Sequence, residues 1–307
     1  MRIFKQLLLV FLVLMLSGPA AGQVIPGNAA GFEENRALLP MVMTKYPEGP
    51  GSITGRAFDA SKPTHDSIEG AEICVFDQCD TTDSDGIYML EGIPGGMRWL
   101  EAAAPDFYQT YEIVRVKEGE VAERDIALTP FLELSDVFMR VVVTWNETPV
   151  WPPDNTRNDL DAHLWLEAPD PPTHIDFSYR GDCTTFPNAC LESDYQTGYG
   201  PETLAIRQLE STTYHFGVLN YYAGYPGVPP ITSSQAKVRV YLESGEYYEF
   251  DVPTTGTGDF WYVFSLESDG TTASLEEHNC ITGFNGEVPD CSKASTQSIP
   301  ISLRKIK

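Results

Sequence analysis

The stretch Asp159–Leu166, with the sequence DLDAHLWL, decides the fold class of this chain. Leucine and alanine alternate strictly along it with charged or aromatic residues. This period of two is typical of a β-strand with one face in a core, because successive side chains point to opposite faces. The face opposite the aliphatic side chains carries Asp159, Asp161, His163 and Trp165. We therefore expect a functional site on this face.

A second acidic segment, 194–202, is rich in tyrosine and glycine and follows this strand in the chain. Residues two apart on a strand lie roughly 6.6–7 Å apart at their Cα atoms, close enough to share one cation. Calcium takes oxygen ligands, which acidic loops supply. The expected calcium ligands are Asp159, Asp161, Asp194 and Glu202. The alternative is that these are structural edge residues, with Asp161 capping a loop amide and Glu202 paired with Arg207.

Aromatic side chains near the same two segments suggest a carbohydrate site, since flat rings and flanking carboxylates suit sugar rings and their hydroxyl groups. The expected contact residues are Trp165, Tyr195, Tyr199 and Tyr222. The alternative is that they are ordinary tyrosines of a sandwich. His163 is a candidate ligand of a transition metal, against the alternative of a hydrogen-bonded structural histidine.

Short runs of alternating residues recur from Gly51 to Leu128, separated by glycine, proline and aspartate. A second, longer set begins at Val137 and includes the organising strand. Such spacing of short strands is typical of β-sandwiches. Long helical periodicity is absent from the sequence. The sequence therefore predicts an all-β chain of two sandwich modules in tandem.

The first set carries a specific group of motifs: Gly51-x-x-x-Gly55, Gly70-Ala71, TTDSDGIYML at 81–90, Ile93-Pro94-Gly95 and Ile126-Ala127-Leu128. Together they resemble the carboxypeptidase regulatory-like domain, a small transthyretin-like sandwich grouped with starch-binding-like folds. The resemblance implies that residues 50–130 form such a sandwich and that this module has no chemistry of its own.

The second set resembles the YfaP-like domain of unknown function, which occurs in exported bacterial proteins. The matching pieces are VVTW at 142–145, DLDAHL at 159–164, GYGPE at 198–202 and YHFGV at 214–218. Ala162 stands where that pattern more often has leucine. The resemblance implies that residues 131–267 form a larger, jelly-roll-like sandwich, and it implies little about function.

The ends of the chain and its cysteines predict export. Residues 1–22 combine a basic start, an apolar run and small residues, as in a secretory signal peptide, and the run is too short to span a membrane. We expect a linker arm at 23–49 and a disulfide-stapled extension at 268–307. An even number of cysteines in an exported chain indicates disulfides. The expected pairs are Cys74–Cys79, Cys183–Cys190 and Cys280–Cys291.

Charge and motifs narrow the function. The 44 acidic residues outnumber the 20 basic ones, for a net charge of −24, which argues against nucleic acid and anionic membranes as partners. Zinc-peptidase and nucleophile-elbow motifs are absent from the sequence, so we expect no enzyme. We expect a secreted, extracellular or periplasmic module that binds carbohydrate or a surface protein. The alternatives are a calcium-stabilised structural domain and an accessory module of a hydrolase.

Overall fold

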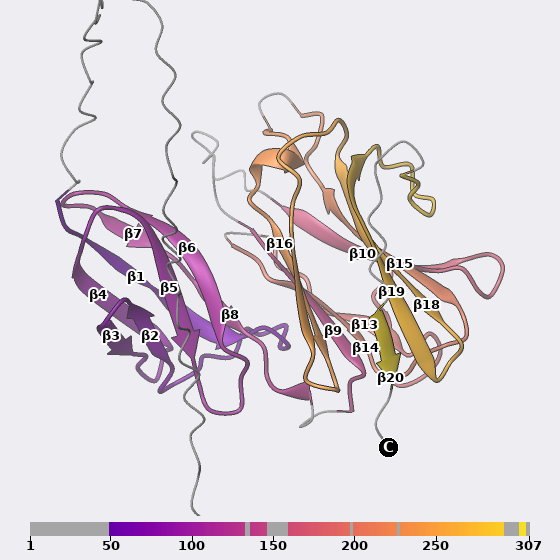
Figure 1. Ribbon diagram of the computed structural model, residues 1–307, viewed down its shortest axis with the longest axis horizontal. Helices are drawn as coiled ribbons and strands as arrows, with labels where there is room; N and C mark the ends of the chain where they lie inside the picture. The colour runs from indigo at the N-terminus through magenta and orange to yellow at the C-terminus, as the bar shows by residue number, and fades with distance from the viewer. Residues whose placement is uncertain are drawn as a thin grey trace, which may run out of the picture. The chain divides into compact units, whose positions relative to one another are not determined.

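The computed structural model describes residues 49–132, 136–145, 159–196, 199–225 and 228–291, together with the backbone of strand 301–304 (Figure 1). Nearly all regular structure in these ranges is β-strand, which confirms the all-β prediction. The predicted signal peptide 1–22 and the arm 23–49, apart from Gly49, lie outside the described residues.

Residues 51–128 form two small sheets. The strands are β1 (Gly51–Asp59), β2 (Glu72–Val75), β3 (Gln78–Thr81), β4 (Ile87–Ile93), β5 (Gly96–Ala103), β6 (Thr110–Val116), β7 (Val121–Glu123) and β8 (Ile126–Leu128). One sheet has the order β4-β1-β7, with β8 also paired to β1, and the other has the order β3-β2-β5-β6. Alternating residues of both sheets share one buried core, which includes Ile53, Tyr88 and Leu100.

The glycine at position 55 is required by the close approach of two backbones. A Cβ atom there would overlap the carbonyl of Arg124, which lies between the two strands that run parallel to β1. Arg124 also donates its backbone N–H to Thr54 across this gap, at 2.8 Å. The Gly51-x-x-x-Gly55 motif therefore permits β1 to sit at the centre of its sheet.

The second set of strands forms two six-stranded sheets. They are β9 (Met139–Thr144), β10 (Leu160–Leu166), β11 (Thr173–Ile175), β12 (Gly181–Asp182), β13 (Ala189–Ser193), β14 (Glu202–Ile206), β15 (Thr213–Asn220), β16 (Lys237–Leu242), β17 (Tyr247–Asp251), β18 (Phe260–Ser268), β19 (Thr272–Thr282) and β20 (Ile301–Arg304), with a 3₁₀ turn η2 (Ile231–Ser233). The sheet orders are β11-β10-β15-β18-β19-β20 and β12-β13-β14-β9-β16-β17.

Strand β10 is buried on both faces. Leu160, Ala162, Leu164 and Leu166 enter the core of the second module, as the alternation predicts. The opposite face, expected to be open, is covered by a segment that we call the cover loop, residues 283–291. Phe284 and Val288 of this loop pack against a cluster that contains Trp165, Phe260 and the Cys280–Cys291 pair.

The C-terminal boundary also differs from the prediction, which ended the module at residue 267. That position lies inside β18, and β19 pairs with β18 along its length. Residues 268–282 therefore belong to the sheet and are not a separate extension. The polar composition of β19 hides its strand character, because only its inner residues, such as Ala273 and Leu275, are apolar.

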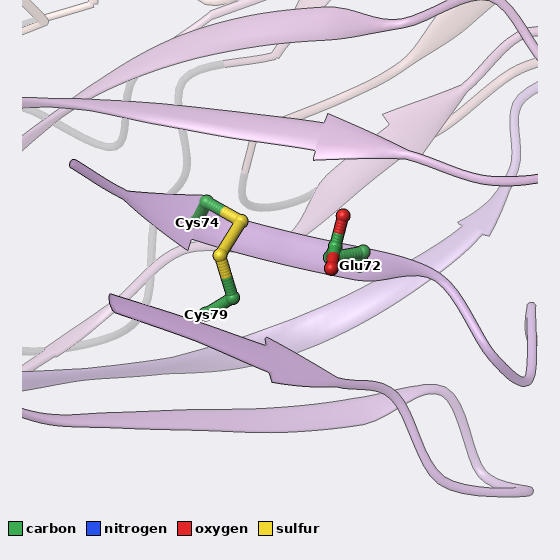
Figure 2. Close-up of side chains that lie close together, drawn as sticks. All are labelled: Glu72, Cys74 and Cys79. Carbon is green, nitrogen blue, oxygen red and sulfur yellow. A yellow bond between two sulfur atoms is a disulfide. The ribbon is translucent and has the colours of Figure 1, made fainter. Parts of the chain in front are cut away.

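All three predicted disulfides are present. The Cys74–Cys79 bond joins β2 to β3, beside Glu72 (Figure 2). The described residues contain no helix long and apolar enough to cross a membrane.

Side chains of the two modules meet in a buried ionic network. The carboxylate of Glu112 on β6 binds Arg124 and also Arg239 of β16, whose Nη1 lies 2.8 Å from Glu112 Oε1. All three residues are at most 5% exposed. Burial opposes ionisation of Glu112, but the two guanidinium groups outweigh it and hold the pKa of this carboxyl below its usual range.

Candidate functional site

Carboxylates from both sheets of the second module converge beside β10. Asp159 and Asp161 come from β10 and the residue before it, Asp194 follows β13, and Glu202 opens β14. Glu202 Oε2 accepts a hydrogen bond from the backbone N–H of Ala162 at 2.6 Å, so its side chain crosses from its own sheet to the other. The four acids that the sequence singles out are thus neighbours whose charges act on one another, although no three of their oxygen atoms lie within 4.8 Å of one another.

These carboxyl groups are withdrawn from water. Asp161 is 3% exposed and Glu202 is fully buried. Burial, followed by the charges of Asp159, Asp194 and Asp176, raises the pKa of Asp161 to about 8. Burial and then Asp161 likewise raise the pKa of Glu202 well above its ordinary value. Without a cation, protons must therefore neutralise part of this cluster at neutral pH.

Asp161 Oδ2 lacks a hydrogen-bond donor within the described part of the chain. The carboxyl groups of Asp194 and Glu202 interact with each other through a side-chain hydrogen bond, for which one of the two must carry a proton. The guanidinium of Arg180 lies 3.9 Å from Asp194 Oδ2, beyond hydrogen-bond distance. The alternative pairing of Glu202 with Arg207 is not formed between these two described residues. Carboxylate oxygen atoms are hard donors of the kind that bind calcium.

A second polar group lies on the same face of β10. His163 Nδ1 is 2.8 Å from His174 Nε2, and His174 Nδ1 is 3.8 Å from Asp176 Oδ2. Burial, with a smaller contribution from His174, lowers the pKa of His163 to about 3, so this imidazole is neutral at neutral pH. From the sequence alone, His163 is the one histidine expected to bind a metal. Pairing of β10 with β11 sets His174 opposite Trp165 and supplies the second histidine.

The four aromatic residues expected to bind carbohydrate do not gather. Trp165 is 2% exposed beneath the cover loop, so its ring is not on the surface. Tyr195 packs against His65 of the first module at 4.4 Å between ring centroids. Tyr199 also contacts the first module, with its hydroxyl donating to the carbonyl of Glu123 at 2.6 Å. These three side chains therefore pack against other parts of the protein.

Tyr222 does take part in a surface group, with partners that the sequence analysis did not select. An aromatic row runs through Phe177, Tyr221, Tyr222 and Tyr225, with successive ring centroids 5.5, 5.0 and 6.0 Å apart. Phe177, Tyr221 and Tyr225 are 40–66% exposed. Burial and then the charge of Asp159 raise the pKa of Tyr222, so the row borders the acidic cluster.

Glu72, Cys74 and Cys79 form a further cluster whose atoms are close enough for a metal (Figure 2). Both sulfur atoms are joined in a disulfide and are not thiolates, which are the form that binds metal. This cluster is therefore a hairpin staple.

Cys280 and Cys291 hold the cover loop over Trp165, whose indole Nε1 donates to the carbonyl of Gly286 at 3.4 Å. Replacing both cysteines with serine is expected to cost at most ~2–3 kcal/mol of unfolding free energy, because the closed loop is short. It should also make Trp165 accessible to acrylamide, measured as fluorescence quenching relative to a Trp165→Phe background. The same double replacement at Cys74 and Cys79 should leave quenching unchanged. Equal quenching in the two double variants would show that the cover loop does not shield Trp165.

Comparison with known proteins gives no family. No family model matches the chain, and no curated protein matches it. A solved protein of unknown function, SAV2460, is similar over 49% of this chain and 91% of its own, at 17% identity and a TM-score of 0.38. A variant of BcpA, the major pilin subunit of Bacillus cereus, is similar over 84% and 96%, at 11% identity and a TM-score of 0.26. These likenesses are too distant to assign a function.

Proposed function

We propose that this chain is a non-catalytic extracellular binding module whose second sandwich holds a calcium ion at Asp159, Asp161, Asp194 and Glu202. The observation that carries the proposal is the fully buried Glu202, which lies beside Asp161 and Asp194 and has no cationic side chain as a partner among the described residues. Buried carboxylates without compensation are costly, so they bind either a proton or a cation.

Calcium is the cation that suits this group of ligands. All the donors are carboxylate oxygens, which favour calcium and magnesium over softer metals. The ligands come from separate strands and loops, and calcium tolerates such irregular geometry better than magnesium does. An exported protein meets calcium at concentrations that fill sites of modest affinity, with Kd on the order of 10⁻⁴–10⁻³ M.

Calorimetric titration of the chelator-treated protein tests the proposal. We expect one calcium ion to bind with release of protons, because Asp161 and Glu202 must ionise to ligate it. Proton release is measured from the dependence of the binding heat on the ionisation enthalpy of the buffer. Glu202→Gln should abolish binding, whereas Glu120→Gln, an exposed control, should not. Equal calcium affinity in both variants would contradict the site.

The aromatic row supports a second function, the binding of carbohydrate. Exposed rings in a row present apolar faces on which sugar rings stack, and the neighbouring acids accept hydroxyl hydrogen bonds. A glycan array with the full chain tests this function. Replacing Tyr221 and Tyr225 with alanine should abolish the signal, while Phe76→Ala, an exposed ring on the first module, should leave it intact. Absence of any glycan signal in the unmodified protein would refute this function.

A further inference from the structure

Three potential metal ligands lie on β10, on β11 and just after β11, next to the acidic cluster but with ligand atoms of their own. His163, His174 and Asp176 each offer one ligand atom, and these atoms lie within 4.8 Å of one another. We propose that they bind a zinc ion. Two imidazole nitrogens and one carboxylate oxygen are donors that zinc prefers, whereas the all-oxygen cluster beside them suits calcium.

The hairpin between β10 and β11 fixes the positions of the three ligands. His174 pairs with Trp165, which places it diagonally across from His163 on the same face. The two ring planes of Trp165 and His174 stack at 4.2 Å and 9°. This stacking holds the His174 imidazole toward His163, so two of the three ligands are oriented before a metal arrives.

The carboxylate of Asp176 is also held in place. Its Oδ1 accepts hydrogen bonds from the backbone N–H of Ser178 at 2.8 Å, the Ser178 hydroxyl at 2.6 Å and the backbone N–H of Tyr179 at 3.0 Å. These bonds leave Oδ2 directed to the His174 side, 3.8 Å from its Nδ1. Hydrogen bonds of this kind to a ligating carboxylate are what orient it in metal sites.

The distance between the histidines is close to what zinc needs. Zinc–nitrogen bonds of about 2.0–2.1 Å in a tetrahedral site place two ligand nitrogens about 3.3 Å apart. His163 Nδ1 and His174 Nε2 are 2.8 Å apart, whereas Asp176 Oδ2 lies 3.8 Å from the other ring nitrogen of His174, Nδ1. A half-turn of the His174 imidazole about its Cβ–Cγ bond places Nε2 between His163 Nδ1 and Asp176 Oδ2, and a shift of roughly half an ångström then admits the ion. His174 can make this shift because it lies on the three-residue edge strand β11 and its side chain is 25% exposed.

The surroundings separate the inner side of the site from water and leave its outer side open. The ring centroids of Phe260 and Phe284 lie 5.9 and 4.9 Å from that of His163. His163 itself is 1% exposed. On the other side, His174 and Asp176 reach solvent. Three protein ligands with one open direction leave a fourth position for water or another small ligand.

Cobalt provides the probe, because tetrahedral cobalt absorbs visible light and occupies zinc sites. We expect the untagged full chain to bind one cobalt ion with this absorption and to release it on addition of zinc. His174→Ala should weaken cobalt binding by at least about a hundredfold. Asp176→Asn, which keeps an oxygen for the Ser178 and Tyr179 bonds, should weaken it by at least about tenfold. His278→Ala, a control at a histidine bonded to Ser265, should bind as the unmodified protein does.

The two metal sites are distinguished by their variants. Asp161→Asn should lose calcium stabilisation and keep the cobalt spectrum, while His174→Ala should do the reverse. If the unmodified protein shows no tetrahedral cobalt spectrum, or if His174→Ala and Asp176→Asn both retain it in full, the zinc site is wrong. The three side chains are then a hydrogen-bonded chain from Asp176 through His174 to His163.

Discussion

Arg239→Ala is expected to lower the free energy of unfolding by about 3–5 kcal/mol, the cost of breaking a buried ion pair by removing one partner. Arg239 is 2% exposed and binds four acceptors: Glu112 Oε1 at 2.8 Å, the Tyr111 carbonyl at 2.9 Å, Glu249 Oε2 at 2.9 Å and Thr144 Oγ1 at 3.4 Å. Its removal leaves Glu112 buried with Arg124 as its remaining charge partner among the described residues. Equilibrium unfolding in urea measures the change.

Arg115→Ala is the control, because Arg115 lies on the exposed side of β6, the strand that carries Glu112. We expect its effect to stay within about 0.5 kcal/mol. A double-mutant cycle with Glu112→Gln should give a coupling energy above roughly 1 kcal/mol, as contacting charges do. Additive effects of the two substitutions would show that the network contributes no energy across the modules.

In chelator, the contribution of Asp161 to the stability of the protein, measured as the difference from Asp161→Asn, is expected to fall as pH rises from about 4 to about 8, and calcium should remove this fall. The unfolded chain releases the Asp161 proton near its ordinary pKa of ~3.9, whereas the folded chain releases it only near a pKa of about 8. Between these values folding takes up a proton, so each unit of rising pH costs up to ~1.4 kcal/mol. Bound calcium stabilises the ionised form instead.

Asp161→Asn isolates this contribution, since asparagine is neutral and similar in shape to the protonated acid. In chelator at pH 8, the variant should be more stable than the unmodified protein, and calcium should no longer raise its melting temperature. At a hundredfold excess over Kd, calcium adds about 2.7 kcal/mol to the unmodified protein. Urea unfolding at pH 5, 6.5 and 8, with calcium and with chelator, measures both effects. Parallel pH curves for the two proteins would refute the raised pKa of Asp161.

The sequence was sufficient to predict β10 and that its acids lie near Asp194 and Glu202, while calcium binding by these acids stays a prediction. Strict alternation determines which residues of a strand share a face, and the segment around Glu202 was itself unusually acidic. The covering of Trp165 could not be predicted, because the cover loop is short, rich in polar residues and joined to β10 only through the folded sheet. The two-residue alternation of apolar and polar residues shows to which face of a strand each side chain points, but not which other segment covers that face.

The failure at Tyr195 and Tyr199 has a different cause. Both rings contact the first module, through His65 and Arg124 respectively, and local sequence carries no signal for contacts between modules. The sequence did not predict a role for His174, because the register between its strand and β10 was not known. The pairing of His174 with Trp165 depends on the detailed turn between β10 and β11, for which the sequence alone gives no register.

The strand pairing also sets the order in which the two modules can be completed during synthesis. Every partner of β1 lies within residues 87–128, so the first module can close as soon as that part of the chain has emerged. Strand β9 needs β14 and β16, and β10 needs β15. The cover loop is made later still. Long separations between partners slow folding, so the second module spends longer with its strand edges exposed and is the part more in need of chaperones.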